Sequence, residues 1–189
     1  MAARKKAKRK ANRGGGEGAG LWAPKLGVFL LRVFTGLILV SAVHYKLTAP
    51  GLPLGEALDH FVEHDYVPLV ERAVANPPNV LGFEWQWFSD AMGAVALGGA
   101  APKVLGISVL ALEGLVGIAL MLGACTRLAA GLGAGLMTVF GLAKGTYFLT
   151  VSQSNWYIVM ICIMLALTGA GRIWGLDARL RHRLPGWIS

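Results

Sequence analysis

The sequence predicts an all-α integral membrane protein, a four-transmembrane-helix bundle with an extracytoplasmic helical insert between the first and second spans. Three observations predict this fold class. The chain of 189 residues is 55% hydrophobic and only 15% charged, so it is more apolar than a typical soluble domain. It contains four long apolar runs, and aromatic residues lie near the ends of these runs, as in membrane-spanning helices.

The four predicted spans are residues 26–46, 104–123, 128–149 and 156–172, the last of them marginal in length. About 20 helical residues cross a hydrocarbon core about 30 Å thick, so runs of this length are typical of transmembrane helices. With the segments that connect them, the spans form one predicted membrane domain over residues 26–177.

Basic residues are concentrated at the two ends of the chain. Residues 1–25, a predicted disordered tail, hold eight Lys and Arg side chains against one acid, and a second basic tail covers residues 178–189. If both termini lie in the cytoplasm, thirteen of the eighteen basic residues lie on the inner side, as the positive-inside rule requires. The overall positive charge averages these tails with an acidic insert, so it gives no argument for nucleic-acid binding.

The predicted extracytoplasmic insert, residues 47–103, carries seven acidic residues and only two basic ones. Apolar periodicity predicts short helices over residues 55–64, from Pro68 to about residue 75, and over residues 83–97. Helices with Trp and Phe on one side and acids on the other suit the membrane surface or the mouth of a bundle.

Arg32 and Glu113 lie deep inside predicted spans. A charged side chain costs several kcal/mol there, so each needs a partner or a wet cavity. The expected depths of the two residues differ by roughly 6 Å, which predicts a contact between them. Two interpretations stay open: a structural lock between the first two spans, and a polar pocket for a small ligand or a proton path.

A second group of polar residues collects near the predicted outer ends of the spans. Its ammonium, imidazole and phenol groups suit an anion or a quinone carbonyl, and the alternative is that the two lysines only extend to the lipid headgroups. No catalytic residue is assigned, and the candidate pocket residues are Arg32, Glu113, His44, Lys46, Lys144, Tyr147 and Asn155.

The sequence predicts no metal site and no haem. His60 and His64 have HxxxH spacing, but this is a weak signal that fits a solvated helix face better than a metal ligand pair. Cys125 and Cys162 have neither a CxxC motif nor a histidine at ligand spacing.

The second and third spans are rich in glycine, which in lipid allows helix backbones to approach closely. Two GxxxG pairs, Gly131/Gly135 and Gly141/Gly145, predict packing inside the bundle, with homo-oligomer contact as the alternative.

Several short motifs resemble the DoxX family, including its DoxD-type subunits, over about residues 26–177. These motifs are Leu31-Arg32…Gly36, His44…Lys46, Glu113-Gly114…Gly117, Thr126-Arg127, Asn155-Trp156 and Gly169-Ala170-Gly171…Leu176-Asp177. The resemblance implies a four-helix protein of the prokaryotic cytoplasmic membrane, linked to redox complexes such as thiosulfate:quinone oxidoreductase. The family often has His-Gly-x-x-Lys where this chain has the tighter His44-Tyr45-Lys46.

The sequence therefore favours an integral membrane subunit of a respiratory or redox complex that interacts with a quinone in electron transfer. Whether such a subunit is itself catalytic stays open. The alternative is a non-catalytic accessory or scaffolding subunit of a larger membrane assembly. The expected partners are the lipid bilayer and other subunits of a membrane protein complex.

Overall fold

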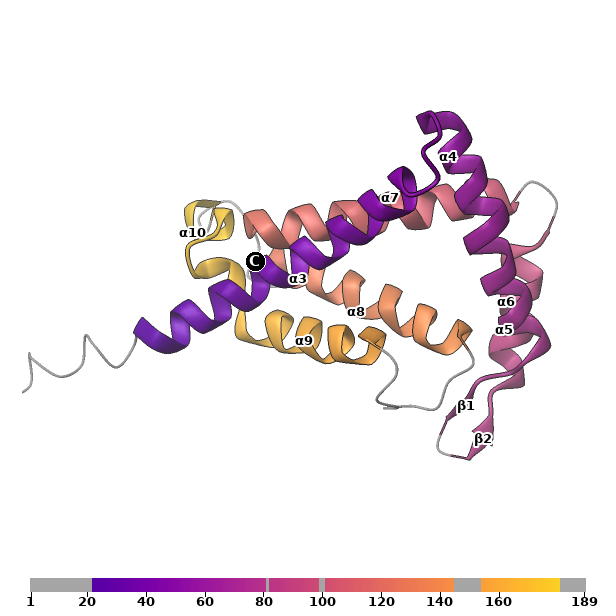
Figure 1. Ribbon diagram of the computed structural model, residues 1–189. Helices are drawn as coiled ribbons and strands as arrows, with labels where there is room; N and C mark the ends of the chain where they lie inside the picture. Colours follow the sequence, from indigo (N-terminus) through magenta and orange to yellow (C-terminus); the bar gives the residue numbers. More distant parts are fainter. Residues whose placement is uncertain (1–21, 81, 99–100, 145–153, 181–189) are drawn as a thin grey trace, which may run out of the picture.

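Four apolar helices form a bundle in the computed structural model, which describes residues 22–80, 82–98, 101–144 and 154–180 (Figure 1). They are α3 (Trp22–Thr48), α7 (Ala101–Leu122), α8 (Thr126–Ala143) and α9 (Ser154–Thr168). Three of them, α3, α7 and α8, are long and apolar enough to cross a membrane. The protein is therefore mostly helical and of the membrane-embedded type.

The third helix is shorter than the sequence predicts. The apolar run suggested a span over 128–149, but α8 ends at Ala143 and Lys144 is its C-cap. Residues 145–153 lie outside the described residues. Lys144 therefore lies at the end of α8 and not inside it.

The fourth apolar helix also ends earlier than predicted. The expected span reached residue 172, whereas α9 ends at Thr168 and a 3-10 turn, η2 (Ala170–Arg172), follows it. Gly169 separates the two with a φ of 59°, a left-handed conformation that commonly terminates helices. The 15 residues of α9 rise about 22 Å, which is less than the thickness of a hydrocarbon core.

Antiparallel helix pairs form the bundle, with α3 against α7 and α8 against α9. The backbones of α3 and α7 meet at two glycines: a β-carbon at Gly36 would lie 2.5 Å from the carbonyl oxygen of Gly117. In the other pair, Gly141 lies against the indole ring of Trp156. These close approaches are the packing that small residues permit between helices in lipid.

The two predicted GxxxG pairs differ in role. Gly141 packs inside the bundle as expected, while Gly145 lies outside the described residues. The prediction is wrong for Gly131 and Gly135, since both are exposed on α8 and a β-carbon at either would have no neighbour within 4 Å. The four-residue spacing fixes their common helix face but not the direction in which it points.

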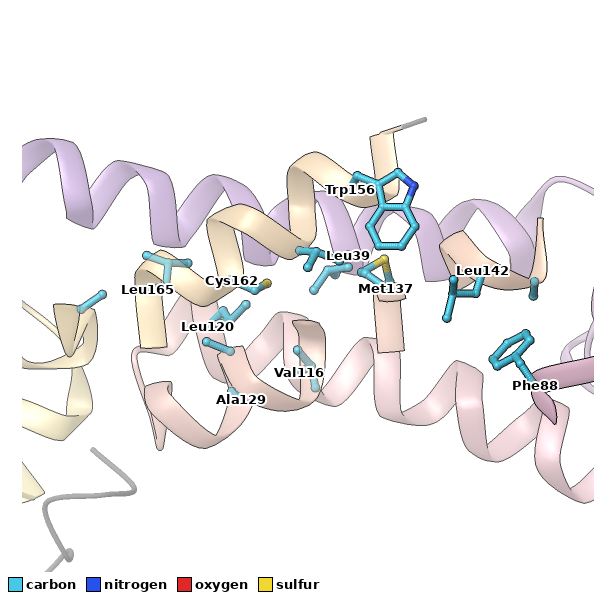
Figure 2. Packing of buried hydrophobic residues seen from close by; sticks show 14 of the residues in the cluster. Leu39, Phe88, Val116, Leu120, Ala129, Met137, Leu142, Trp156, Cys162 and Leu165 are labelled. Carbon is cyan, nitrogen blue, oxygen red and sulfur yellow. The ribbon is translucent and has the colours of Figure 1, made fainter. Parts of the chain in front are cut away.

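A continuous apolar core runs along the inside of the bundle (Figure 2). Leu39 of α3, Leu120 of α7 and Leu165 of α9 are almost fully buried within it. At one end the core reaches Phe88, which lies beside Leu142 of α8 in Figure 2 and comes from the segment between α3 and α7.

The segment between α3 and α7 forms a helical cap, defined here as Leu54–Ala96. It consists of α4 (Leu54–Phe61), the π-helical turn η1 (Val62–Tyr66), α5 (Val67–Ala75), β1 (Asn79–Val80), β2 (Phe83–Glu84) and α6 (Gln86–Ala96). Figure 1 shows the cap lying across the end of the bundle where α3 ends and α7 begins. The hydroxyl of Ser89 on α6 donates a 2.6 Å hydrogen bond to the carbonyl of Ala73 on α5. This bond holds α6 against α5 within the cap.

Two predictions for this segment need correction. The helices expected over 55–64 and from Pro68 are one continuous helical run, because η1 joins α4 to α5 with helical dihedral angles at both junctions. Pro68 is the second residue of α5, just after the π-helical turn, where the backbone hydrogen-bond pattern changes and a residue without an N–H is tolerated. The helix expected over 83–97 starts only at Gln86, since Phe83 and Glu84 pair with β1 in an antiparallel hairpin.

The opposite end of the bundle is closed by η2 and α10 (Leu176–Leu180). The sequence predicts that Asp177 caps a short basic helix over residues 178–184, but Asp177 lies inside α10 and caps α8. Its carboxylate accepts hydrogen bonds from the backbone N–H groups of Cys125 (2.7 Å) and Thr126 (2.9 Å). Its own N–H donates to the carbonyl of Gly123, which ties the C-terminal segment to the turn between α7 and α8.

Candidate functional site

A buried ion pair joins α3 to α7. The Lys46 ammonium lies 2.6 Å from the Glu113 carboxylate, and the exposed fractions of the two side chains are 24% and 4%. A second ion pair, Lys103–Asp59, has the same length but is largely exposed. In apolar surroundings, removing either charge of an ion pair leaves the other charge buried and unpaired, which destabilises the protein.

The predicted Arg32–Glu113 contact is wrong, and the helix register explains why. Gly36 meets Gly117 in the antiparallel α3–α7 pair, so Arg32 lies beside Gly123. Glu113 is ten residues from Gly123, about 15 Å along α7. The depth of each charge can be predicted from the sequence only through estimated helix ends, and the register between α3 and α7 cannot be predicted in this way.

Arg32 is fully buried at the opposite end of the bundle from the cap. Its guanidinium donates hydrogen bonds to the carbonyls of Ala170 (2.8 Å) and Ile173 (3.2 Å), and it lies over the ring of Phe29. The guanidinium therefore binds backbone carbonyls of the segment that follows α9, as cations commonly do at the C-terminal ends of helices. Arg32 does not form the floor of a pocket shared with Glu113.

A second polar pair lies close to Lys46 and Glu113. The Lys144 ammonium donates a 3.2 Å hydrogen bond to the side-chain carbonyl of Asn155, which is buried at the start of α9. Lys144 also lies within electrostatic range of both Lys46 and Glu113. These four residues are called the lysine–glutamate cluster below. They bring α3, α7, α8 and α9 together at the capped end of the bundle.

Aromatic rings border the cluster. The Lys46 ammonium lies 5.5 Å from the ring centroids of both Phe61, in the cap, and Phe140, on α8. At this distance a cation is attracted to the face of an aromatic ring, and the rings also exclude water from the ion pair. The cap therefore covers the cluster from the side opposite to the bundle core.

The remaining candidate residues are placed elsewhere. His44 is exposed on α3 and lies two residues before Lys46, on roughly the opposite side of the helix, so it does not join the cluster. Tyr147 lies outside the described residues. His60 and His64 stack with ring centroids 4.1 Å apart on the cap, and the described residues contain no group of three His, Cys, Asp or Glu side chains that could hold a metal ion.

The lysine–glutamate cluster holds two ammonium groups and one carboxylate. Such a site attracts an anion or a hydrogen-bond acceptor, because the positive charge exceeds the negative charge in apolar surroundings. Glu113 adds a group that can take up or release a proton. The arrangement suits a small, polar-ended ligand whose apolar part lies among the helices.

Sequence reasoning assigned Asp177 to the wrong helix, since this fully buried residue holds the C-terminal segment to α8. The glycines Gly171, Gly123 and Gly175 indicate tight packing nearby but do not identify the partner of Asp177. A β-carbon at Gly171 would collide with the Asp177 carboxylate, and one at Gly123 or Gly175 with the Arg32 guanidinium. Glycines spaced around two buried charges mark a site where backbone and side chains are tightly packed.

Comparison with models of known families, with curated proteins and with solved structures gave no match for this chain. The DoxX resemblance therefore stays a prediction from short motifs.

Proposed function

We propose that this chain is an integral membrane subunit of a redox complex, and that it binds a quinone at the lysine–glutamate cluster. The observation that carries the proposal is the buried Lys46–Glu113 pair beside the Lys144–Asn155 pair. Ionisable residues that face the interior of a membrane bundle are costly, and they commonly mark a ligand or proton pathway.

The chemistry of the cluster fits a quinone headgroup. Its two carbonyl oxygens accept hydrogen bonds, and Lys144 and Lys46 are donors. Reduction of a quinone to a quinol takes up two electrons and two protons, and Glu113 is placed to exchange one of those protons with the ligand. The electrons would come from a partner subunit or its cofactor, since a membrane protein of this kind supplies binding and protons.

The proposal includes the arrangement of the chain in the membrane. We place four spans in the prokaryotic cytoplasmic membrane, with α9 and the residues that follow it as the fourth. Both termini lie in the cytoplasm and the cap lies outside. The concentration of basic residues at the two ends of the chain supports this orientation.

The test is the quinone content of the protein purified in mild detergent, measured by extraction and mass spectrometry. Lys144→Met should lower bound quinone about tenfold, the effect of losing one charge-assisted hydrogen bond, while the protein still assembles. Lys103→Met is the matched control, because it removes an exposed ammonium that is also paired. Equal quinone content in wild type and Lys144→Met contradicts the proposal.

A second candidate function is that of a non-catalytic accessory subunit in a larger membrane assembly. The outward-facing Gly131 and Gly135 favour it, since a glycine face on a spanning helix allows another helix to approach closely. This function predicts a stable partner in the purified complex, no bound quinone, and loss of the partner in Gly135→Leu. Bound quinone with an unchanged subunit composition in Gly135→Leu contradicts it.

A further inference from the structure

The two ends of the cap carry exposed apolar side chains. Leu54 begins α4 at one end, and Phe83 and Trp87 lie at the other, on β2 and the first turn of α6. The exposed fractions of Phe83 and Trp87 are 72% and 63%, which are large for aromatic residues. The neighbouring Trp85 packs beside Trp87 with ring centroids 5.6 Å apart, so the hairpin end holds an aromatic group and not isolated residues.

The position of the hairpin limits what these residues can contact. Figure 1 shows that β1 and β2 project sideways from the cap, past the ends of α8 and α9. In a membrane-embedded bundle, a segment placed beside the helix ends lies at the depth of the lipid headgroups. The aromatic group therefore continues the lipid-facing surface of the bundle.

The exposed acids of the cap lie beside the hairpin as well as on the other cap helices. The exposed acids Glu56, Glu63 and Glu71 lie on α4, η1 and α5, on the side away from the buried residues that face the bundle. Beside the aromatic group, the exposed charged residues are Glu84 and Asp90, both acidic. An acidic surround disfavours anionic lipid, so the suitable surface is a zwitterionic headgroup layer.

We propose that the hairpin end of the cap, through Phe83 and Trp87, inserts into the headgroup region of the bilayer leaflet beside the bundle. Trp and Phe are well suited to this layer, because their rings are apolar and the indole N–H can still reach water or a headgroup. The insertion holds the cap at the membrane surface. The cap in turn covers the lysine–glutamate cluster through Phe61.

The test is fluorine NMR of the whole chain, labelled with fluorotryptophan and reconstituted in phosphatidylcholine nanodiscs. Trp87→Phe identifies the Trp87 resonance among the six tryptophans without loss of an aromatic ring. Trp156 is the matched control, because it is buried inside the bundle. Two paramagnetic probes are compared: lipid spin-labelled at the headgroup, and a gadolinium chelate that stays in water.

The expected result is that headgroup-labelled lipid removes most of the Trp87 signal, while the chelate leaves most of it. Trp156 should keep its signal with both probes. Replacing a third of the lipid with phosphatidylglycerol should leave the Trp87 result unchanged or weaken it.

Three outcomes overturn the proposal. The first is a Trp87 signal removed by the chelate and not by the lipid, which places the hairpin in water and leaves its aromatic group for a protein partner. The second is a signal that neither probe changes, which means that the protein itself covers Trp87. The third is stronger loss from lipid labelled at the end of its acyl chain than at the headgroup, which places Trp87 in the hydrocarbon core.

Discussion

Buried charges are satisfied separately at the two ends of the bundle. Glu113 is paired with Lys46 under the cap, and Arg32 binds the carbonyls of Ala170 and Ile173 at the other end. The partners of Arg32 are fixed parts of the backbone, so Arg32 has a structural role.

This role predicts that Arg32→Leu destabilises the protein by about 2–4 kcal/mol, because the buried carbonyl of Ala170 and the partly buried carbonyl of Ile173 lose a charged donor. Thermal unfolding in detergent, followed by circular dichroism, measures the change. Arg72→Leu is the matched control, since Arg72 is exposed on α5 and its loss should change the free energy of unfolding by less than about 0.5 kcal/mol. Equal melting temperatures for the two variants would show that Arg32 does not hold the C-terminal segment.

At the scale of elements, the contact between Gly36 and Gly117 determines how α3 packs against α7. A side chain at Gly36 would meet the backbone of α7, which cannot move aside as a flexible side chain can. The register fixed by this contact places Lys46 beside Glu113. The glycine contact is therefore a structural condition for the lysine–glutamate cluster.

We expect Gly36→Ala to destabilise the protein by about 1–3 kcal/mol through overpacking. Gly131→Ala makes the same chemical change on an exposed helix face, where it should be neutral or stabilise by up to about 1 kcal/mol. Both variants are compared by thermal unfolding in the same detergent. A Gly36→Ala variant as stable as Gly131→Ala would mean that the two backbones are farther apart than the structure has them.

The sequence predicts the main helices well, because each is a long apolar run, but it fails where tertiary contacts decide. The short hairpin of β1 and β2 has too few residues for a periodic pattern, so its second strand was included in the helix expected over 83–97. Asp177 was assigned to the nearest helix in the chain, whereas its carboxylate caps a helix more than fifty residues away in sequence. Neither contact leaves a local signal.

At the scale of the whole molecule, the cap and the bundle form one packed unit. Phe88 enters the end of the bundle core, and Tyr66 and Val62 pack against Gly106 of α7. Burial in this contact raises the pKa of the Tyr66 phenol above its ordinary value of 10.0. The pKa of Tyr66 therefore indicates whether the cap remains packed against the bundle.

The raised pKa predicts a loss of stability in alkali. In the folded protein Tyr66 keeps its proton to a higher pH than in the unfolded chain, so its contribution is constant below the ordinary tyrosine pKa. Stability then decreases as the pH rises through and above about 10. Melting temperatures at pH 8 and pH 11 should differ less in Tyr66→Phe than in wild type. An equal difference in both proteins would mean that the phenol is solvated.

The sequence also predicted most members of the candidate site but not their grouping. Lys46, Lys144, Glu113 and Asn155 were all identified as polar residues in or near apolar runs. The pairing of Glu113 with Lys46 depends on the register between α3 and α7, which no pattern within a single helix contains. Arg32 was grouped with Glu113 for the same reason, although the two lie at different ends of the bundle.

The most direct test of a ligand site at the lysine–glutamate cluster is the quinone content of Glu113→Gln relative to Asp59→Asn. Each change neutralises the acid of a 2.6 Å ion pair, one buried under the cap and one exposed. We predict that Glu113→Gln still assembles but loses most of its bound quinone, while Asp59→Asn keeps the wild-type amount. Wild-type quinone content in assembled Glu113→Gln, or loss of assembly in proportion to loss of quinone, would contradict a ligand site and leave the pair as a structural lock.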